Sequence, residues 1–391
     1  MRVKLKDIFD LQMGKTPSRS NLEYWNTTDY KWISIADLTK TSKYIFETKE
    51  YLSKSAIKDS GIKVIPANTV VMSFKLSIGK TAITKEDMYS NEAIMAFKDK
   101  HVINIIPEYI FYLFKYKNWE ECSNKAVMGK TLNKATLSEI EVEICSIEKQ
   151  RQIVNILDKI MSAVDGRKQE LQLLDELIKA RFVEMFGNPV TNEKGWNQKQ
   201  LGEITTKLGS GATPKGGKEA YQEDGITLIR SMNVHNGLFE YKELAHISEE
   251  QATKLDNVTI EENDVLLNIT GASVARSCVV PSKILPARVN QHVCIIRCNQ
   301  RIVPEFLNKL LIDDNYQRLL WSIARGGATR EAITKQQVES LKIIVPPIEL
   351  QNQFADFVHQ VDKSKFDTMT FAPIYAIINL YLHTYFYQGR R

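Results

Sequence analysis

The sequence lacks the long apolar runs, paired cysteines and signal segments by which secreted and membrane proteins are recognised. Its 391 residues contain five cysteines, an odd number, and no two of them form a Cys-x-x-Cys pair. This usage is typical of a reducing cytoplasm, where cysteines pack as small apolar side chains. The N-terminus alternates charged with apolar residues and has no hydrophobic run of the signal-peptide kind. We therefore expect a cytoplasmic protein with no membrane partner.

Nucleotide- and metal-binding motifs are also missing. Gly-Lys-Thr occurs at Gly14, Gly79 and Gly129, but a phosphate-binding loop needs a further glycine five residues earlier, and other residues stand there. The sequence has no Gly-x-Gly-x-x-Gly, His-Glu-x-x-His or Gly-x-Ser-x-Gly motif. Cys294 and Cys298 lie near His292, but a structural zinc site would need a fourth well-spaced ligand. These absences favour a binding protein over an enzyme.

The composition is that of a globular protein with a mildly basic balance. Apolar residues make up 43% and charged residues 25% of the chain, and the formal net charge is +5. This length predicts two or three domains, since one domain typically has on the order of 150 residues. The excess of positive charge permits a polyanionic partner without requiring one.

A duplication is the most informative feature that is present. Six short motifs recur in the same order about 200 residues later, which indicates two diverged copies of one unit. The paired motifs begin at Leu5 and Leu201, Gly14 and Gly211, Trp32 and Leu228, Asn68 and Asn263, Pro107 and Pro304, and Ile147 and Ile348. Short β-rich runs bounded by turn residues, and a helical segment after each Pro-Glu pair, indicate a mixed α and β structure in each copy.

A long helical segment follows the first copy and stops at Gly187-Asn-Pro189. Its apolar residues alternate at spacings near three and four, the pattern of a helix that packs on another helix. These seam residues are Ile153, Leu157, Ile160, Val164, Leu171, Leu174, Ile178 and Phe182. Gly166 and Arg167 interrupt the seam, and we expect a weak point or kink there. A buried helix of one larger domain is the alternative, but a spacer between two copies is favoured.

Three loops that recur in both copies combine glycine with hydroxyl and basic residues. Glycine lets backbone amides approach phosphate oxygens, hydroxyls and cations complete the contact, and Arg or Asn can read bases. Ordinary exposed turns gather the same residue types, but their repetition favours nucleic-acid binding. The candidate DNA-binding residues are Lys15, Thr16, Arg19, Lys75, Ser77, Lys80, Lys130 and Lys134 in the first copy, and Thr213, Lys215, Lys218, Thr270, Ser273, Arg276, Arg325, Thr329 and Arg330 in the second.

Together these features resemble the specificity subunit of type I restriction-modification systems over residues 1 to about 365. The resemblance is carried by the paired Gly-x-Thr-Pro motifs, the Ile-Glu-Lys-Gln and Ile-Glu-Leu-Gln helix entries, Pro346-Pro347 and Phe186-Gly187-Asn188-Pro189. It implies an α/β (mixed α+β) fold, in which two similar target-recognition domains are separated by long antiparallel helices of the coiled-coil type. Each domain would read one half of an interrupted target in double-stranded DNA.

The resemblance also implies a division of the chain and a set of partners. Expected are a first recognition domain (1–146), a central spacer helix (147–187), a second recognition domain (188–346), a shortened second spacer helix (347–365) and an atypical apolar tail (366–391). The chain would have no catalytic residues and would bind no metal or cofactor. Modification (methyltransferase) subunits would hold S-adenosylmethionine and contact the seam residues, and restriction (translocase and nuclease) subunits would use ATP and Mg.

Three alternatives remain at this point. They are a self-sufficient nuclease–methyltransferase fragment, a structural protein that dimerises through its long helix, and a silent truncated specificity cassette. The tail motivates the last one, because it is apolar, aromatic and interrupted by Pro373, and it carries no heptad seam. Salt-dependent DNA binding would separate a DNA-reading protein from a scaffold.

Overall fold

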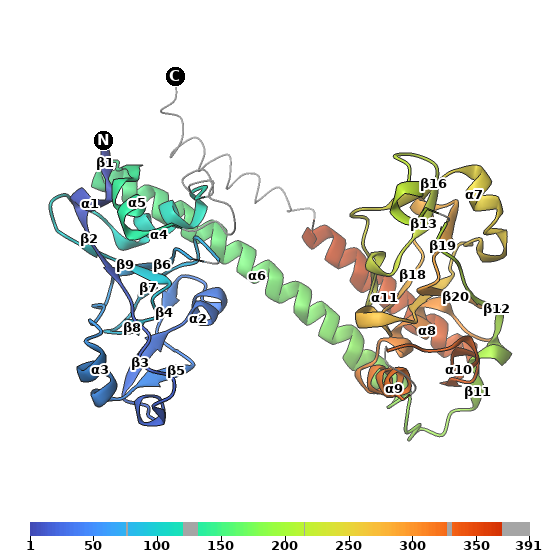
Figure 1. The fold of residues 1–391 in the computed structure, drawn as a ribbon. Helices are drawn as coiled ribbons and strands as arrows, with labels where there is room; N and C mark the ends of the chain where they lie inside the picture. The colour runs from blue at the N-terminus through green and yellow to red at the C-terminus, as the bar shows by residue number, and fades with distance from the viewer. Residues whose placement is uncertain (76, 120–131, 215, 327–330, 370–391) are drawn as a thin grey trace. The chain divides into compact units, whose positions relative to one another are not determined.

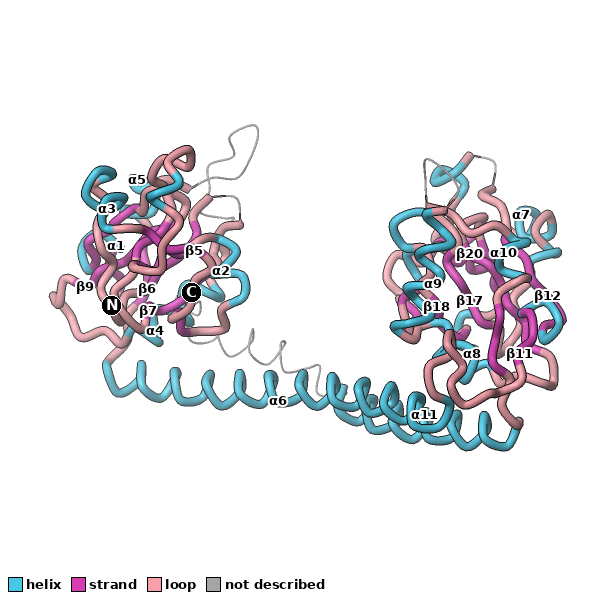
Figure 2. The backbone as a smooth tube through the Cα atoms, turned by 90° about the horizontal axis from the view of Figure 1, so that it is seen from below, coloured by secondary structure: helices cyan, strands magenta, loops and turns pink. Residues whose placement is uncertain are grey.

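The computed structural model of the chain describes residues 1–75, 77–119, 132–214, 216–326 and 331–369. These residues form two compact units, 1–167 and 168–369, which divide within the long helix α6 (Ile147–Phe186). Each unit combines sheets and helices (Figures 1 and 2). The predicted atypical tail lies outside the described residues from position 370 onward.

The first unit contains a five-stranded, a three-stranded and a two-stranded sheet, with the strand orders β2-β9-β6-β7-β4, β5-β3-β8 and β1-β10. Its strands are β1 (Arg2–Lys4), β2 (Phe9–Met13), β3 (Tyr30–Ile33), β4 (Tyr44–Ile45), β5 (Glu50–Leu52), β6 (Val70–Ser73), β7 (Thr81–Thr84), β8 (Tyr89–Ser90), β9 (Ile94–Asp99) and β10 (Glu141–Glu143). Its helices are α1 (Leu5–Ile8), α2 (Ile35–Lys40), α3 (Lys54–Ser60), α4 (Pro107–Tyr116), α5 (Lys134–Glu139) and the first part of α6.

Helix α4 and the five-stranded sheet build the core of the first unit. All residues of β6 and β7 are buried, as expected for strands that are covered on both faces. Pro107 occupies the first turn of α4, where its missing amide has no helical partner to lose, and six successive residues from Tyr109 are buried. The rings of Phe97 on β9 and Phe114 on α4 lie 4.7 Å apart, which joins the helix to the sheet.

The second unit has sheets with the strand orders β12-β20-β17-β18, β16-β13-β19, β11-β21 and β14-β15. Its strands are β11 (Gln198–Gln200), β12 (Thr205–Ser210), β13 (Ile226–Ile229), β14 (Val234–His235), β15 (Leu238–Phe239), β16 (Ala245–Ile247), β17 (Val265–Asn268), β18 (Ser277–Val279), β19 (Ala287–Val289), β20 (Val293–Cys298) and β21 (Lys342–Ile344). Its helices are the remainder of α6, α7 (Glu249–Thr253), α8 (Pro304–Leu311), α9 (Asp314–Arg325), α10 (Lys335–Glu339) and α11 (Ile348–Met369).

The two units repeat one topology. The order β2-β9-β6-β7 corresponds to β12-β20-β17-β18, and β5-β3-β8 corresponds to β16-β13-β19. The equivalent pairs β3–β8 and β13–β19 are both parallel. Asn68 and Asn263, which the sequence paired, both have positive φ angles, of 59° and 66°, ahead of β6 and β17. Asparagine tolerates this backbone region better than most residues, so the same turn is built in both units.

Helix α6 keeps its helical backbone through Gly166 and Arg167, so the expected weak point does not interrupt it. The two compact units nevertheless divide between Arg167 and Lys168. The seam side chains are buried or half-buried in the unit to which each belongs. Ile153, Leu157, Ile160 and Val164 lie in the first unit, and Leu171, Leu174, Ile178 and Phe182 lie in the second.

Within the second unit, α6 packs antiparallel to α11. The ring of Phe182 lies 5.5 Å from that of Phe354, near the C-terminal end of α6 and the start of α11. Asp175, earlier on α6, pairs with Lys365, later on α11, at 2.6 Å. Because the order of contacts along the two helices is opposite, the pair has the predicted antiparallel arrangement.

Candidate nucleic-acid interface

The Gly-x-Thr-Pro loop of the first unit, which begins at Gly14, is hydrogen-bonded to the segment that leads into β9. The amide of Gly14 donates to the carbonyl of Ile94 (3.1 Å), and the amide of Lys15 donates to that of Ser90 (2.8 Å). A Cβ atom on Gly14 would lie 2.2 Å from the carbonyl oxygen of Asn91, so only glycine permits this approach. The hydroxyl of the next motif residue, Thr16, donates to the carboxylate of Glu92.

The second unit repeats this arrangement. The amide of Gly211 donates to the carbonyl of Asn290 (3.1 Å) on the loop that leads into β20. A Cβ atom on Gly211 would lie 1.7 Å from the carbonyl oxygen of Val289. The hydroxyl of Thr213 donates to the side-chain carbonyl of Gln291, which stands where the first unit has Glu92. The paired motifs therefore perform the same structural task.

The second and third predicted loops reach the same place in each unit. In the first unit, Phe74 after β6 donates its amide to Ala93 (3.0 Å) and accepts from the amide of Leu132 (3.2 Å) at the end of the third loop. In the second, Ile269 donates to His292 (2.9 Å) and accepts from Ile333 (2.8 Å). The first and second loops, and the described residues that end or follow the third loops, thus meet at the start of β9 or β20.

Most basic residues of the first unit's loops are exposed at this end. Lys15, Lys80 and Lys134 are exposed, as is Ser77, while Lys75 is half-buried with its ammonium 5.3 Å from the ring centre of Phe74. The Thr16 hydrogen bond to Glu92, aided by the positive charges of Lys75 and Arg19, lowers the pKa of the Glu92 carboxyl group. Lys75 and Arg19 therefore place positive charge near one fixed carboxylate, whereas the Nζ atom of Lys15 donates to the carbonyl of Ser60.

Arg19 is engaged within the unit. Its Nη2 donates to Oε2 of Glu50 at 3.1 Å, and its guanidinium carbon lies 3.7 Å from the ring centre of Trp25. Trp25 in turn meets Trp32, which is buried, in an edge-on contact. This pairing holds the guanidinium group over an aromatic ring, where it makes a cation–π contact.

A chain of hydrogen bonds joins the loops of the second unit. Thr213 donates to Gln291 Oε1, Gln291 Nε2 lies 3.0 Å from His292 Nε2, and His292 Nδ1 is bonded to the hydroxyl of Thr270. An amide nitrogen can only donate, so the Nε2 atom of His292 accepts and its Nδ1 carries the proton. The side chains of Gln291 and His292, on the loop before β20, therefore connect the first loop to the second.

The structure describes some of the other predicted DNA-binding residues of the second unit. Ser273 and Arg276 are half-buried, and the carbonyl of Arg276 accepts from the amide of Asn268 at 2.8 Å. Arg325 is exposed, with its guanidinium carbon 5.0 Å from the ring centre of Trp321. Lys130, Lys215, Thr329 and Arg330 lie outside the described residues, as does the side chain of Lys218.

Sequence reasoning missed Glu92, Gln291 and the role of His292. A signal was available, because Asn91-Glu92 and Asn290-Gln291 stand at equivalent places in the two copies. Asn91 and Asn290 donate their amides to Ile33 (3.1 Å) and Ile229 (3.0 Å), respectively, which confirms the equivalence. The three residues are part of the interface defined by the loops.

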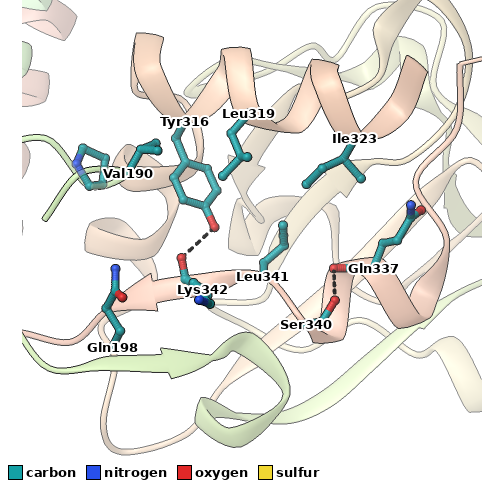
Figure 3. A pocket seen from close by; sticks show the side chains of 10 residues that line it. Val190, Gln198, Tyr316, Leu319, Ile323, Gln337, Ser340, Leu341 and Lys342 are labelled. Carbon is teal, nitrogen blue, oxygen red and sulfur yellow. Dashed lines mark hydrogen bonds between the residues drawn. The ribbon is translucent and has the colours of Figure 1, made fainter. Parts of the chain in front are cut away.

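A separate cavity of about 490 Å³ lies in the second unit between α9 and β21 (Figure 3). Its lining is largely apolar, with Leu319 and Ile323 on one wall, and Tyr316 donates to the carbonyl of Lys342 at 3.0 Å. None of the candidate loop residues lines it. Over the described part of the chain, no cluster of metal-ligating side chains gathers, and no helix there is long and apolar enough to span a membrane.

The chain is similar to several known proteins along most of its length. A protein-family model for the type I restriction modification DNA specificity domain matches residues 1–176 and 193–374. The MjaIX type I restriction enzyme specificity subunit of Methanocaldococcus jannaschii is 26% identical over 379 residues, which cover 91% of this chain and 85% of that protein.

Two solved structures share the fold. One is a type I restriction-modification S subunit from M. genitalium, with a TM-score of 0.59, 13% identity and coverage of 99% of this chain and 96% of that chain. The other, from work on complex assembly of the type I R-M system, has a TM-score of 0.57, 16% identity and coverage of 97% and 95%. The predicted fold class, two similar mixed α and β domains with long helices, is confirmed.

Proposed function

The chain belongs to the family of type I restriction modification DNA specificity domains, and from this premise we propose that it reads DNA for a type I restriction-modification enzyme in the cytoplasm. Each unit would recognise one half of an interrupted target in double-stranded DNA, and α6 would connect the two readers. The observation that carries the proposal is the repetition of one loop arrangement in both units. Two copies of one binding surface are what a target in two halves requires.

This chain would carry out no chemical step itself. Modification subunits would supply S-adenosylmethionine and transfer the methyl group, and restriction subunits would use ATP and Mg for translocation and cleavage. Basic side chains at the loops would bind phosphates and fix the position on the duplex, while side chains that reach the grooves would select the sequence.

We propose that a modification subunit contacts α6 on a face where the described residues leave apolar side chains exposed. The seam residues are packed within their own units, and two of them, Ile153 and Leu157, are at most 1% exposed. Leu173 and Leu177, by contrast, are 55% and 47% exposed and lie one turn apart on α6. Exposed leucines at this spacing suit a partner helix, so we propose that a modification subunit covers them.

Reconstitution with modification subunits tests the proposal. The chain is co-expressed and co-purified with the methyltransferase subunits of its own system, and the complex is given duplex DNA and labelled S-adenosylmethionine. We expect labelled methyl groups in two half-sites at a constant separation, and none when this chain is omitted. Methyl transfer by the isolated chain, or equal transfer without it, would contradict the proposal.

Salt dependence separates DNA reading from a purely structural role. Binding that neutralises phosphates releases counterions, so the affinity for duplex DNA should fall steeply between 50 and 200 mM salt. A protein that merely dimerises through α6 would show no such binding. Fluorescence anisotropy with a labelled duplex of random sequence measures the effect directly.

A further inference from the structure

The loops before β9 and β20 carry different side chains at one equivalent position. Glu92 and Gln291 each follow an asparagine whose amide is bonded to the three-stranded sheet of its unit. Both side chains are exposed, and each accepts a hydrogen bond from the threonine of the Gly-x-Thr-Pro motif. The backbone frame is therefore the same, and the functional group at its tip differs.

Holding an exposed side chain in place contributes little to folding. Solvent competes for such hydrogen bonds, and ordering a long side chain costs rotamer freedom. The glycine of the same motif allows the close backbone approach that brings this threonine to the loop. An arrangement built twice with little benefit to stability is suited to presenting one group in a fixed position to a ligand.

Both the oxygen and the nitrogen of the Gln291 side-chain amide are hydrogen-bonded within the unit. Its Oε1 accepts from Thr213, and its Nε2 donates to His292, whose other ring nitrogen is bonded to Thr270. An amide oxygen has two lone pairs and an amide nitrogen two hydrogens, so one acceptor and one donor position remain. The major-groove edge of adenine offers the complement, a donor at N6 and an acceptor at N7.

The carboxylate of Glu92 leaves a different set of hydrogen-bonding positions open to a ligand. Its Oε2 accepts from Thr16, and the residue after it is Ala93, which has no polar side chain to take the part of His292. The pKa of its carboxyl group is lowered by the threonine bond and the nearby Lys75 and Arg19, so only acceptors face outward at neutral pH. The amino group at N4 of cytosine is the matching donor in the major groove.

We propose that Glu92 and Gln291 are specificity-determining residues, Glu92 selecting cytosine in one half of the DNA target and Gln291 selecting adenine in the other. Thr16 and Thr213 are positioning residues that hold these two side chains. The inference rests on the proposed function, since it names which residues carry out the reading. It accounts for how two units of one fold can read different sequences.

Selection from a randomised duplex library tests the inference. The full chain and its variants Glu92→Gln and Gln291→Glu are each incubated with the library, and bound duplexes are sequenced. We expect Glu92→Gln to change the preferred base at one position of one half-site by at least about fivefold and to leave the other half unchanged. Gln291→Glu should change the preferred base at one position of the other half-site and leave the first half-site unchanged. Glu141→Gln and Gln169→Glu, at exposed positions outside the three loops, are the controls.

The threonine variants separate positioning from folding. Thr16→Val and Thr213→Val keep the side-chain shape but remove the hydroxyl, so they should weaken the same base preferences without changing which base is preferred. Circular dichroism verifies that every variant is folded. Unchanged base preferences in both Glu92→Gln and Gln291→Glu would overturn the inference while the proposed function stands. A wild-type chain that enriches no sequence would overturn both.

Discussion

Gln150 and Gln351 fix the starts of the two long helices in the same way. Gln150 is fully buried; its side chain accepts from the amide of Ile106 (2.9 Å) and donates to the carbonyls of Asn104 and Cys145 (both 3.0 Å). Gln351 is also fully buried, and its partners are Val303, Arg301 and Pro346. One side chain thus satisfies three backbone groups in each unit.

Replacing either glutamine by leucine should lower the free energy of unfolding by about 3 kcal/mol, because leucine has a similar size but pairs none of these buried groups. Gln152→Leu and Gln353→Leu, at exposed positions in the same helices, are the matched controls and should change it by less than about 0.5 kcal/mol. Urea unfolding followed by tryptophan fluorescence measures the difference. Equal effects at buried and exposed positions would refute this role.

Three cysteines of the second unit should be chemically inert. Burial raises the pKa of the Cys278, Cys294 and Cys298 thiols to about 12. Only thiolate reacts with alkylating reagents, and a raised pKa keeps the thiol protonated as the pH rises. At pH 8 we expect iodoacetamide to modify them at least about a hundredfold more slowly in the folded chain than in urea. Peptide mass spectrometry checks this, and rapid alkylation of the folded chain would be the contrary result.

At the residue scale, sequence reasoning reached the loops but not their partners. The duplicated Gly-x-Thr-Pro motif pointed to Thr16 and Thr213 because glycine and hydroxyl residues recur there. The residues that these threonines hold, Glu92 and Gln291, are 76 and 78 positions away. The equivalent places of Asn91-Glu92 and Asn290-Gln291 in the two copies were a signal for these residues. Their pairing with the threonines depends on which loops the sheet brings together, and the sequence does not show that.

At the scale of elements, the periodicity of α6 was visible in the sequence, and the resemblance implied an antiparallel partner helix, but the core residues that cover most of the seam were not predicted. A seam at spacings of three and four shows that one face is covered, without stating what covers it. Ile153 and Leu157 are covered by the core of the first unit, and Ile178 and Phe182 by that of the second. Leu173 and Leu177, which are exposed, mark a different face of α6, and this is the face that we propose for the contact with other proteins.

Leu173→Glu combined with Leu177→Glu should abolish co-purification of modification subunits, because charged side chains would be buried without partners in that contact. DNA binding by the chain itself should stay within about twofold of wild type, since neither residue belongs to the loops. Lys168→Glu, another exposed change on α6, is the control and should leave the complex intact. Pull-down and anisotropy give the two readouts. Retention of the complex by the double variant would place the contact elsewhere.

At the scale of the whole molecule, the separation of the half-sites should depend on the continuity of α6. Proline within a helix removes a hydrogen bond and costs about 3 kcal/mol. We expect Gly166→Pro to leave the base preferences of each half intact while the separation between halves varies among selected duplexes. Gly166→Ala, where an added Cβ meets nothing within 4 Å, should keep the separation constant. The same constant separation in Gly166→Pro would show that α6 does not set it.

The central claim, two similar units that read two halves of one duplex, is tested most directly by a footprint. Duplexes selected by the full chain are treated with dimethyl sulfate, which modifies guanine in the major groove, with and without bound protein. The account predicts two protected segments on each duplex, separated by an unprotected gap of the same length in every sequence. A single continuous protected segment, or protection of one half alone, would contradict it.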